Sequence, residues 1–144
     1  MRTVQFFLFA LIAIPSIVFG AEINENTLPG RYVIEARAGS KKATFNLNIQ
    51  NASQFEIQRT DRNPNAKICP GQYRVVDAPN YGESFDTSKR FEGVFTCPDE
   101  PNNKADFNIT FKNATTRDLE RGAWVELDSS LAPGATLSAK MKKQ

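Results

Sequence analysis

The sequence of 144 residues contains no histidine and only two cysteines. The lack of histidine removes the commonest general base, the histidine-dependent nucleophile systems and most zinc sites. No two carboxylates have a spacing that marks them as catalytic partners, and no acidic run has the pattern of a calcium loop. We therefore predict that the protein is not an enzyme and that it uses no cofactor and no metal ion.

A strong excess of charge is also missing, since 18 Lys and Arg stand against 16 Asp and Glu. A nearly neutral chain offers no electrostatic reason to bind nucleic acid or an anionic membrane. The three lysines near the end of the sequence, in Lys140-Met141-Lys142-Lys143, form its basic cluster. We predict that they are a solvated tail or guard an edge strand.

Long apolar runs are absent except at the start, where residues 4–18 follow the positive Arg2. This pattern predicts a secretory signal peptide over residues 1–20, with cleavage after Gly20 or Ala21. Because Glu22 follows, the run is too short for a membrane span of roughly 20 apolar residues. We therefore expect a secreted or periplasmic protein with no integral membrane segment after signal cleavage.

The remaining residues, 21–144, suit a single domain with its own core. The two cysteines, Cys69 and Cys97, predict one disulfide, because bridges form and persist in exported proteins. Cys69 opens one predicted strand and Cys97 closes the next, so both lie at the same end of an antiparallel pair. The loop-entropy account gives such a bridge roughly 3.5 kcal/mol of stabilisation.

A twelve-residue unit occurs twice, at 42–53 and at 104–115, with six identical positions. Both copies alternate apolar and polar residues, which is the pattern of a half-buried strand. Each ends in Asn-Ala-Ser or Asn-Ala-Thr, and these residues favour turns. The chain therefore carries a duplicated strand-turn unit, and the phenylalanines at its apolar positions are predicted to be core, as is Phe55.

Apolar alternation and turn residues predict an all-β fold with no helix, because no window shows a sustained 3.6-residue period. The predicted strands cover residues 30–38, 42–50, 54–59, 72–76, 91–97, 104–112, 119–128 and 135–142. Eight sequential antiparallel strands close into a small up-and-down β-barrel, in which the two repeat copies would face each other. A β-sandwich built from the same strands is the alternative fold.

Three aromatic residues are not explained by alternation on a strand. Tyr81 and Phe85 lie in the longest irregular stretch, 78–90. Aromatic residues on a loop suit partner recognition, although they would also serve to plug the mouth of a barrel. Trp124 is out of phase with Val125 and its apolar neighbours, so it either lines the barrel interior or lies outside as a contact residue. We treat all three as candidate ligand or partner contacts.

The segment Gly30-Arg31-Tyr32 resembles the Gly-x-Trp opening of lipocalins, with Tyr in place of Trp. The size, export and single disulfide are similar to those of small barrel-type periplasmic lysozyme inhibitors, whose inhibitory loop motif is not found in this sequence. The first resemblance implies a lipocalin-like barrel architecture, and neither resemblance assigns a functional residue.

Together these observations predict an exported, non-enzymatic binding protein. Either its barrel carries a small apolar ligand, or its loops bind and inhibit a secreted or periplasmic protein. A barrel lined by phenylalanines can also be full, because eight strands enclose room for side chains or for one small ligand. The alternative function is a structural or envelope-associated assembly protein that uses the duplicated hairpins.

Overall fold

The structure is a computed structural model that describes residues 20–78 and 88–144. The predicted signal peptide, apart from Gly20, lies outside the described residues, as do Tyr81 and Phe85. The elements, in chain order, are β1 (Gly30–Ala38), β2 (Lys41–Ile49), β3 (Gln54–Arg59), β4 (Cys69–Asp77), β5 (Lys89–Thr96), β6 (Lys104–Phe111), α1 (Thr116–Arg121), β7 (Ala123–Asp128) and β8 (Thr136–Lys143).

The strands form a closed antiparallel barrel in which each strand pairs with its neighbours in the sequence. The last strand closes on the first, with a register that runs from Tyr32↔Lys143 to Arg37↔Ser138. This closure confirms the predicted up-and-down barrel over the sandwich. A closed barrel leaves no unpaired edge. The terminal lysines of β8 therefore lie within a paired strand and guard no edge.

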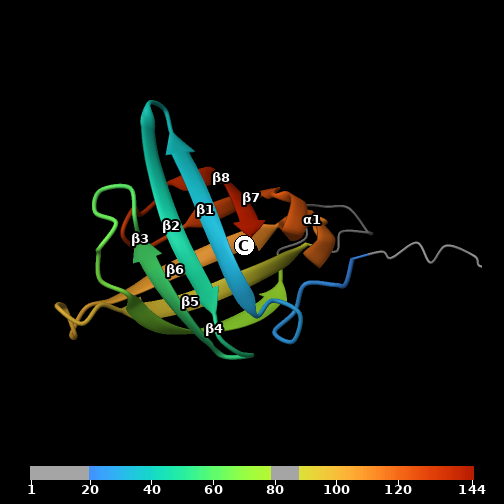
Figure 1. Ribbon diagram of the computed structural model, residues 1–144, viewed down its shortest axis with the longest axis horizontal. Coiled ribbons are helices and arrows are strands. Elements are labelled where there is room, and N and C mark those ends of the chain that lie inside the picture. Colours follow the sequence, from blue (N-terminus) through green and yellow to red (C-terminus); the bar gives the residue numbers. More distant parts are fainter. Residues whose placement is uncertain (1–19, 79–87) are drawn as a thin grey trace, which may run out of the picture.

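The two ends of the barrel differ, and Figure 1 shows them on opposite sides of the molecule. The open end carries the β1–β2 hairpin and the loops 60–68, 97–103 and 129–135. The closed end carries α1 and an N-terminal segment, residues 20–29, which precedes β1. Three buried apolar side chains close this end of the barrel: Ile23 and Leu28 of the N-terminal segment and Leu119 of α1.

Hydrogen bonds tie the N-terminal segment to the barrel. Glu22 forms an isolated antiparallel bridge with Thr115, and the Thr116 N–H donates to the carbonyl of Ala21 at 3.0 Å. The hydroxyl of Tyr32 donates to the carbonyl of Leu28 at 2.7 Å. Burial raises the pKa of Tyr32 to about 12, with smaller contributions from Tyr73 and from a glutamate of α1.

The prediction of a strand from residue 119 is wrong, because α1 occupies residues 116–121 and β7 starts at Ala123. Six helical residues are too few for a 3.6-residue period to be visible. The local signal was the capping pair Thr115 and Asp118. The Asp118 carboxylate accepts a hydrogen bond from the Thr115 N–H at 2.8 Å. Gly122 ends the helix with φ of 96°, a value that favours glycine.

The two repeat copies face each other, as predicted. β2 and β6 stand four strands apart in the closed ring. Phe45 of the first copy and Phe107 of the second occupy equivalent positions, and their ring centroids lie 5.6 Å apart inside the barrel. The duplicated sequence thus supplies one aromatic ring from each of two opposite walls.

The closed half of the barrel is filled by aromatic rings. Phe55 lies edge-on to Phe91 with centroids 5.3 Å apart, and Tyr73 stacks on Phe91 at 4.7 Å. Two glycines make room for Phe55: a methyl group on Gly71 would lie 2.5 Å from Phe55 Cζ, and one on Gly93 would lie 2.9 Å from it. The register through Gly93 is continuous, so this glycine marks a close approach and no bulge.

Gly71→Ala is therefore expected to lower the free energy of unfolding by about 1–3 kcal/mol through overpacking. In a Phe55→Leu background the same substitution should cost less, because the ring has been removed and only the contact with the Val94 carbonyl oxygen, at 2.6 Å, remains of the three nearest ones. Urea unfolding of the four proteins measures this coupling. An equal cost of Gly71→Ala in both backgrounds would show that Phe55 is not the obstacle.

Candidate functional site

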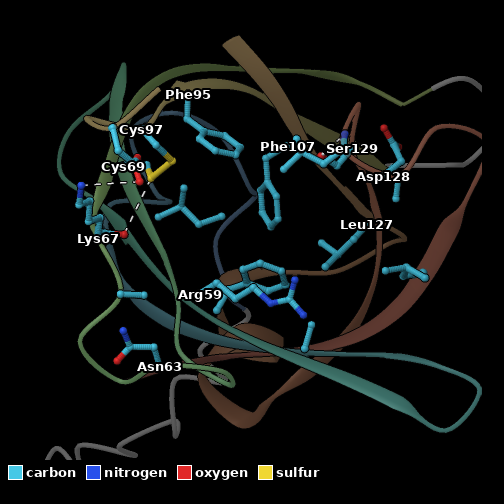
Figure 2. Close-up of a pocket in the computed structure, with 18 of the residues that line it drawn as sticks. Arg59, Asn63, Lys67, Cys69, Phe95, Cys97, Phe107, Leu127, Asp128 and Ser129 are labelled. Carbon is cyan, nitrogen blue, oxygen red and sulfur yellow. Dashed lines mark hydrogen bonds and ion pairs between the residues drawn. A yellow bond between two sulfur atoms is a disulfide. The ribbon is translucent and has the colours of Figure 1, made fainter. Parts of the chain in front are cut away.

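A cavity of about 740 Å³ opens at the open end of the barrel (Figure 2). Most of its lining is apolar, and polar residues gather at its rim. The apolar lining side chains are Ala43, Phe45, Ile57, Ala66, Phe95, Phe107, Leu127, Leu131, Ala132, Ala135 and Leu137. The barrel is thus filled in its closed half and hollow in its open half.

The cavity exists because strands separate towards the open end. β3 pairs with β4 only as far as Ile57↔Cys69, and loop 60–68 continues from there. β6 pairs with β7 at three positions, ending at Asn108↔Asp128. Loops therefore replace paired strands as the cavity walls.

Serine side chains attach loop 129–135 to β6 beyond the paired region. The Ser129 hydroxyl donates to the Asp106 carbonyl at 2.5 Å, and the Ser130 hydroxyl accepts from the Asp106 N–H at 2.9 Å. These bonds satisfy backbone groups of β6 that β7 does not reach. The loop that carries Leu131 is thereby fixed at the rim.

The Cys69–Cys97 disulfide forms part of the cavity wall. It joins the start of β4 to the residue after β5, at the open end, as the positions of the cysteines in the sequence predict. Beside it lies Phe95, which is buried. The bridge therefore fixes the wall where β4 and β5 leave the sheet.

Arg59 is a charged side chain that lines the cavity beside the Phe45 ring. It pairs with Phe45 in the register of β3 and β2, and its guanidinium carbon lies 6.0 Å from the centroid of the Phe45 ring. Asp61 holds the guanidinium from the other side, accepting from Nε at 2.8 Å and from Nη2 at 3.1 Å. The Asp61 carboxylate also accepts from the Thr44 N–H at 3.2 Å.

These bonds shift the pKa of both partners. The Arg59 hydrogen bonds lower the pKa of Asp61 from 3.8 to about 2, with a smaller contribution from Thr44. The same bonds raise the pKa of Arg59. The pair is therefore ionised on both sides at any pH near neutrality.

A pH-dependent stability follows from the lowered pKa of Asp61. A carboxylate with a lower pKa in the folded protein than in the unfolded chain stabilises the fold above about pH 4, and this stabilisation is lost as the pH falls towards about 2. We expect the melting temperature of the wild type to exceed that of Asp61→Asn above about pH 5 and the gap to narrow below about pH 4. A gap that does not change with pH, measured by calorimetry, would contradict this assignment.

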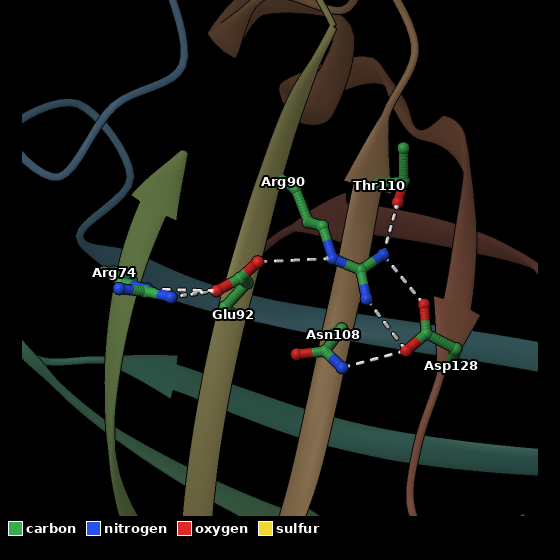
Figure 3. Close-up of polar contacts among 6 residues, drawn as sticks. All are labelled: Arg74, Arg90, Glu92, Asn108, Thr110 and Asp128. Atoms are coloured by element: carbon green, nitrogen blue, oxygen red, sulfur yellow. Dashed lines mark hydrogen bonds and ion pairs between the residues drawn. The ribbon is translucent and has the colours of Figure 1, made fainter. Parts of the chain in front are cut away.

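Asp128, at the rim, is held by a polar network on the outer face of the sheet (Figure 3). Arg90 donates from Nη1 and Nη2 to its two oxygens at 2.9 and 3.0 Å, and Asn108 donates at 2.8 Å. Partial burial works to raise the pKa of Asp128, but the bonds from Arg90 and Asn108 outweigh it and the pKa lies below its usual value. Glu92 links Arg90 to Arg74 in the same network.

Trp124 does not line the cavity. It lies on the outer face of β7, opposite Lys140 of β8, and is 68% exposed, whereas the adjacent Val125 points inward. The structure therefore places it outside the barrel, and its role as a partner contact stays a prediction. Tyr81 and Phe85 lie outside the described residues.

Apart from the two cysteines, which were predicted as a disulfide, the lining residues were predicted as core or were missed. Phe45 and Phe107 were predicted as core, and Phe107 is buried whereas Phe45 is partly buried and packs against the core at the cavity. Arg59 was missed, although it continues the inward alternation of Phe55 and Ile57 to the end of β3. The signal was a cation at the last inward-facing position of a strand, which indicates a polar rim at that end of the barrel.

Among the described residues, no cluster of three metal-ligating side chains is present. In residues 20–78 and 88–144, no helix has the length and apolar character needed to span a membrane. Comparison of the chain with protein-family models, with curated proteins and with solved structures found no match.

Proposed function

We propose that this chain is an exported, non-enzymatic protein that binds a small apolar ligand in the open end of its barrel. The observation that carries the proposal is the cavity of about 740 Å³ with its apolar floor. Small-molecule sites are typically concave, largely apolar and about 300–1,000 Å³ in volume, with a few polar groups that orient the ligand. The cavity has this character, with Phe45 and Phe107 below and Arg59 at the rim.

The closed end supports the same proposal. Ile23, Leu28 and Leu119 seal that end, so a molecule that enters from the open end meets a packed floor. Burial of an apolar ligand against such a floor contributes about 25 cal/mol for each Å² removed from water. Binding at this site therefore needs no conformational change of the closed half.

Export is supported by two independent features. The signal peptide predicted from the sequence would direct the chain out of the cytoplasm. The Cys69–Cys97 bridge suits an oxidising compartment. A disulfide-bonded barrel of this size is compatible with a secreted or periplasmic carrier.

Filling the cavity tests the proposal. Ala43 lines it, so Ala43→Phe is expected to weaken binding of a neutral naphthylamine fluorescent probe by about tenfold or more. Ala52→Phe is the matched control, because Ala52 is exposed in the β2–β3 turn at the closed end. Probe titration followed by fluorescence measures both affinities. Equal losses in the two variants, or no binding of any apolar probe to the wild type, would refute ligand binding in this cavity.

A second candidate function is supported by exposed apolar side chains near the open end. Leu131 is 73% exposed and Ile68 is 52% exposed. Such residues suit contact with a secreted or periplasmic protein. If the protein acts in this way, Ile68→Ser should weaken capture of the partner and leave probe binding within about twofold of the wild type, because Ile68 is not among the residues that line the cavity.

A further inference from the structure

We propose that the cavity selects an uncharged ligand, a largely apolar molecule with one hydrogen-bond acceptor that lies at the Arg59 guanidinium. This inference rests on the proposed function and names the class of ligand for the same cavity. It follows from the pairing of the charged side chains that line the cavity and from the one Arg59 nitrogen that has no acceptor in the described part of the protein.

The charged side chains that line the cavity are two cations and two anions, and each has a partner of opposite charge. The pairs are Arg59 with Asp61, Lys67 with Asp99, and Asp128 with Arg90. The site therefore has no net charge to match an anionic or a cationic ligand. An ion that leaves water for this cavity would lose hydration without gaining a new opposite charge.

Arg59 lies beside the apolar lining and could bind an anionic head group, but it already donates hydrogen bonds to the Asp61 carboxylate. Its Nε and Nη2 donate to the two oxygens of that carboxylate, which is the strongest geometry for such a pair. Asp61 is fixed in turn by the Thr44 N–H of β2. An anion would meet a guanidinium whose charge Asp61 already neutralises, and a cation would approach the guanidinium itself.

The third nitrogen of Arg59 explains why a neutral acceptor is favoured. Within the described part of the chain, Nη1 donates to no protein group. A guanidinium N–H that faces an apolar cavity gains from a carbonyl, ether or hydroxyl oxygen of a ligand, because the oxygen replaces water that the ligand displaces. The apolar part of the ligand would then pack on Phe45 and Phe107.

Lys67 is the cation whose pairing is weakest. It lies 3.6 Å from Asp99, and both side chains are more than half exposed. Exposed pairs of this kind contribute little and open readily. Lys67 therefore provides the control: if an anionic ligand does bind the wild type, Lys67 is the residue that would hold it.

The test compares three amphiphiles with the same alkyl chain: dodecanol, dodecyl sulfate and dodecyltrimethylammonium, all below micelle formation. Dodecyl sulfate is fully anionic near neutral pH, so the charge of this ligand does not change during the measurement. The protein is produced from its whole sequence in an exporting host, so that the disulfide forms. Each amphiphile competes with the neutral naphthylamine probe. We expect dodecanol to bind the wild type about tenfold more tightly than either ion.

Asp61→Asn should abolish the preference for dodecanol over dodecyl sulfate. The substitution removes the competing charge, and the new amide oxygen can still accept from the Thr44 N–H. We expect the affinity for dodecyl sulfate to rise about tenfold while that for dodecanol changes less than about twofold. Asp99→Asn is the matched control at the exposed pair and should change the sulfate affinity less than about threefold.

Each outcome has a distinct meaning. A wild type that binds dodecyl sulfate more tightly than dodecanol, with the preference lost in Lys67→Gln or Arg59→Gln, overturns the inference and identifies the anion-binding residue. Equal binding of all three amphiphiles overturns it as well. Failure of all three and of the probe to bind refutes the proposed function itself. Should Asp61→Asn not fold, the ranking of the three amphiphiles on the wild type decides between these outcomes.

Discussion

Replacing Leu28 with alanine is expected to lower the free energy of unfolding by about 2–5 kcal/mol, the range of fully buried leucines. Leu28 precedes every strand, yet none of its surface is exposed, because it closes the lower end of the barrel. Its carbonyl also accepts the hydrogen bond of the Tyr32 hydroxyl. The substitution leaves an empty space at the closed end of the barrel, which the paired strands around it are too rigid to fill.

Leu131→Ala is the matched control for Leu28→Ala. It removes the same atoms from a leucine that is 73% exposed. Its cost should therefore stay below about 0.5 kcal/mol, as for most surface substitutions. Urea unfolding followed by circular dichroism measures both variants. Similar costs for the two substitutions would mean that the N-terminal segment is not part of the folded core.

Removal of the disulfide is expected to cost roughly 3.5 kcal/mol by the loop-entropy account. The two cysteines stand 28 residues apart in the sequence, which sets the length of the closed loop. Cys69→Ser with Cys97→Ser would also release the cavity wall where β4 leaves β3. We therefore expect weaker binding of the naphthylamine probe together with the lower stability. Guanidinium unfolding and probe titration of the double variant measure the two effects.

Two observations would contradict the prediction for the disulfide. One is reaction of the oxidised protein with a thiol reagent under denaturing conditions, which would show that the cysteines are not bridged. The other is a double variant as stable as the wild type. Lower stability with unchanged probe binding would mean that the disulfide stabilises the fold but does not shape the cavity.

The sequence was sufficient for most of the fold because strand alternation is a local signal. The repeat at Phe45 and Phe107 predicted both the strands and their positions on opposite walls. The helix α1 was missed because one turn and a half carries no countable period, and the apolar Leu119 was assigned to the strand that follows. The capping pair Thr115 and Asp118 was the available sign.

The cavity was harder to predict than the barrel. Whether a barrel is filled depends on how side chains from different strands meet, and this is not a local property. Gly71 and Gly93 let Phe55 occupy the closed half, and strand separation leaves the open half hollow. The inward alternation of Phe55 and Ile57 extends to Arg59 in the sequence, but its register with Phe45 was needed to show that it covers the cavity.

The central claim, that the open end of the barrel binds an apolar ligand, is tested most directly by nuclear magnetic resonance. The neutral naphthylamine probe is titrated into the isotope-labelled protein, and the methyl and ring signals are followed. We predict shifts at Leu127, Leu137 and Phe107, which line the cavity, and none at Leu28 or Leu119 in the closed end. Shifts confined to the closed end or to the outer face around Trp124, or no shifts at all, would contradict the proposed site.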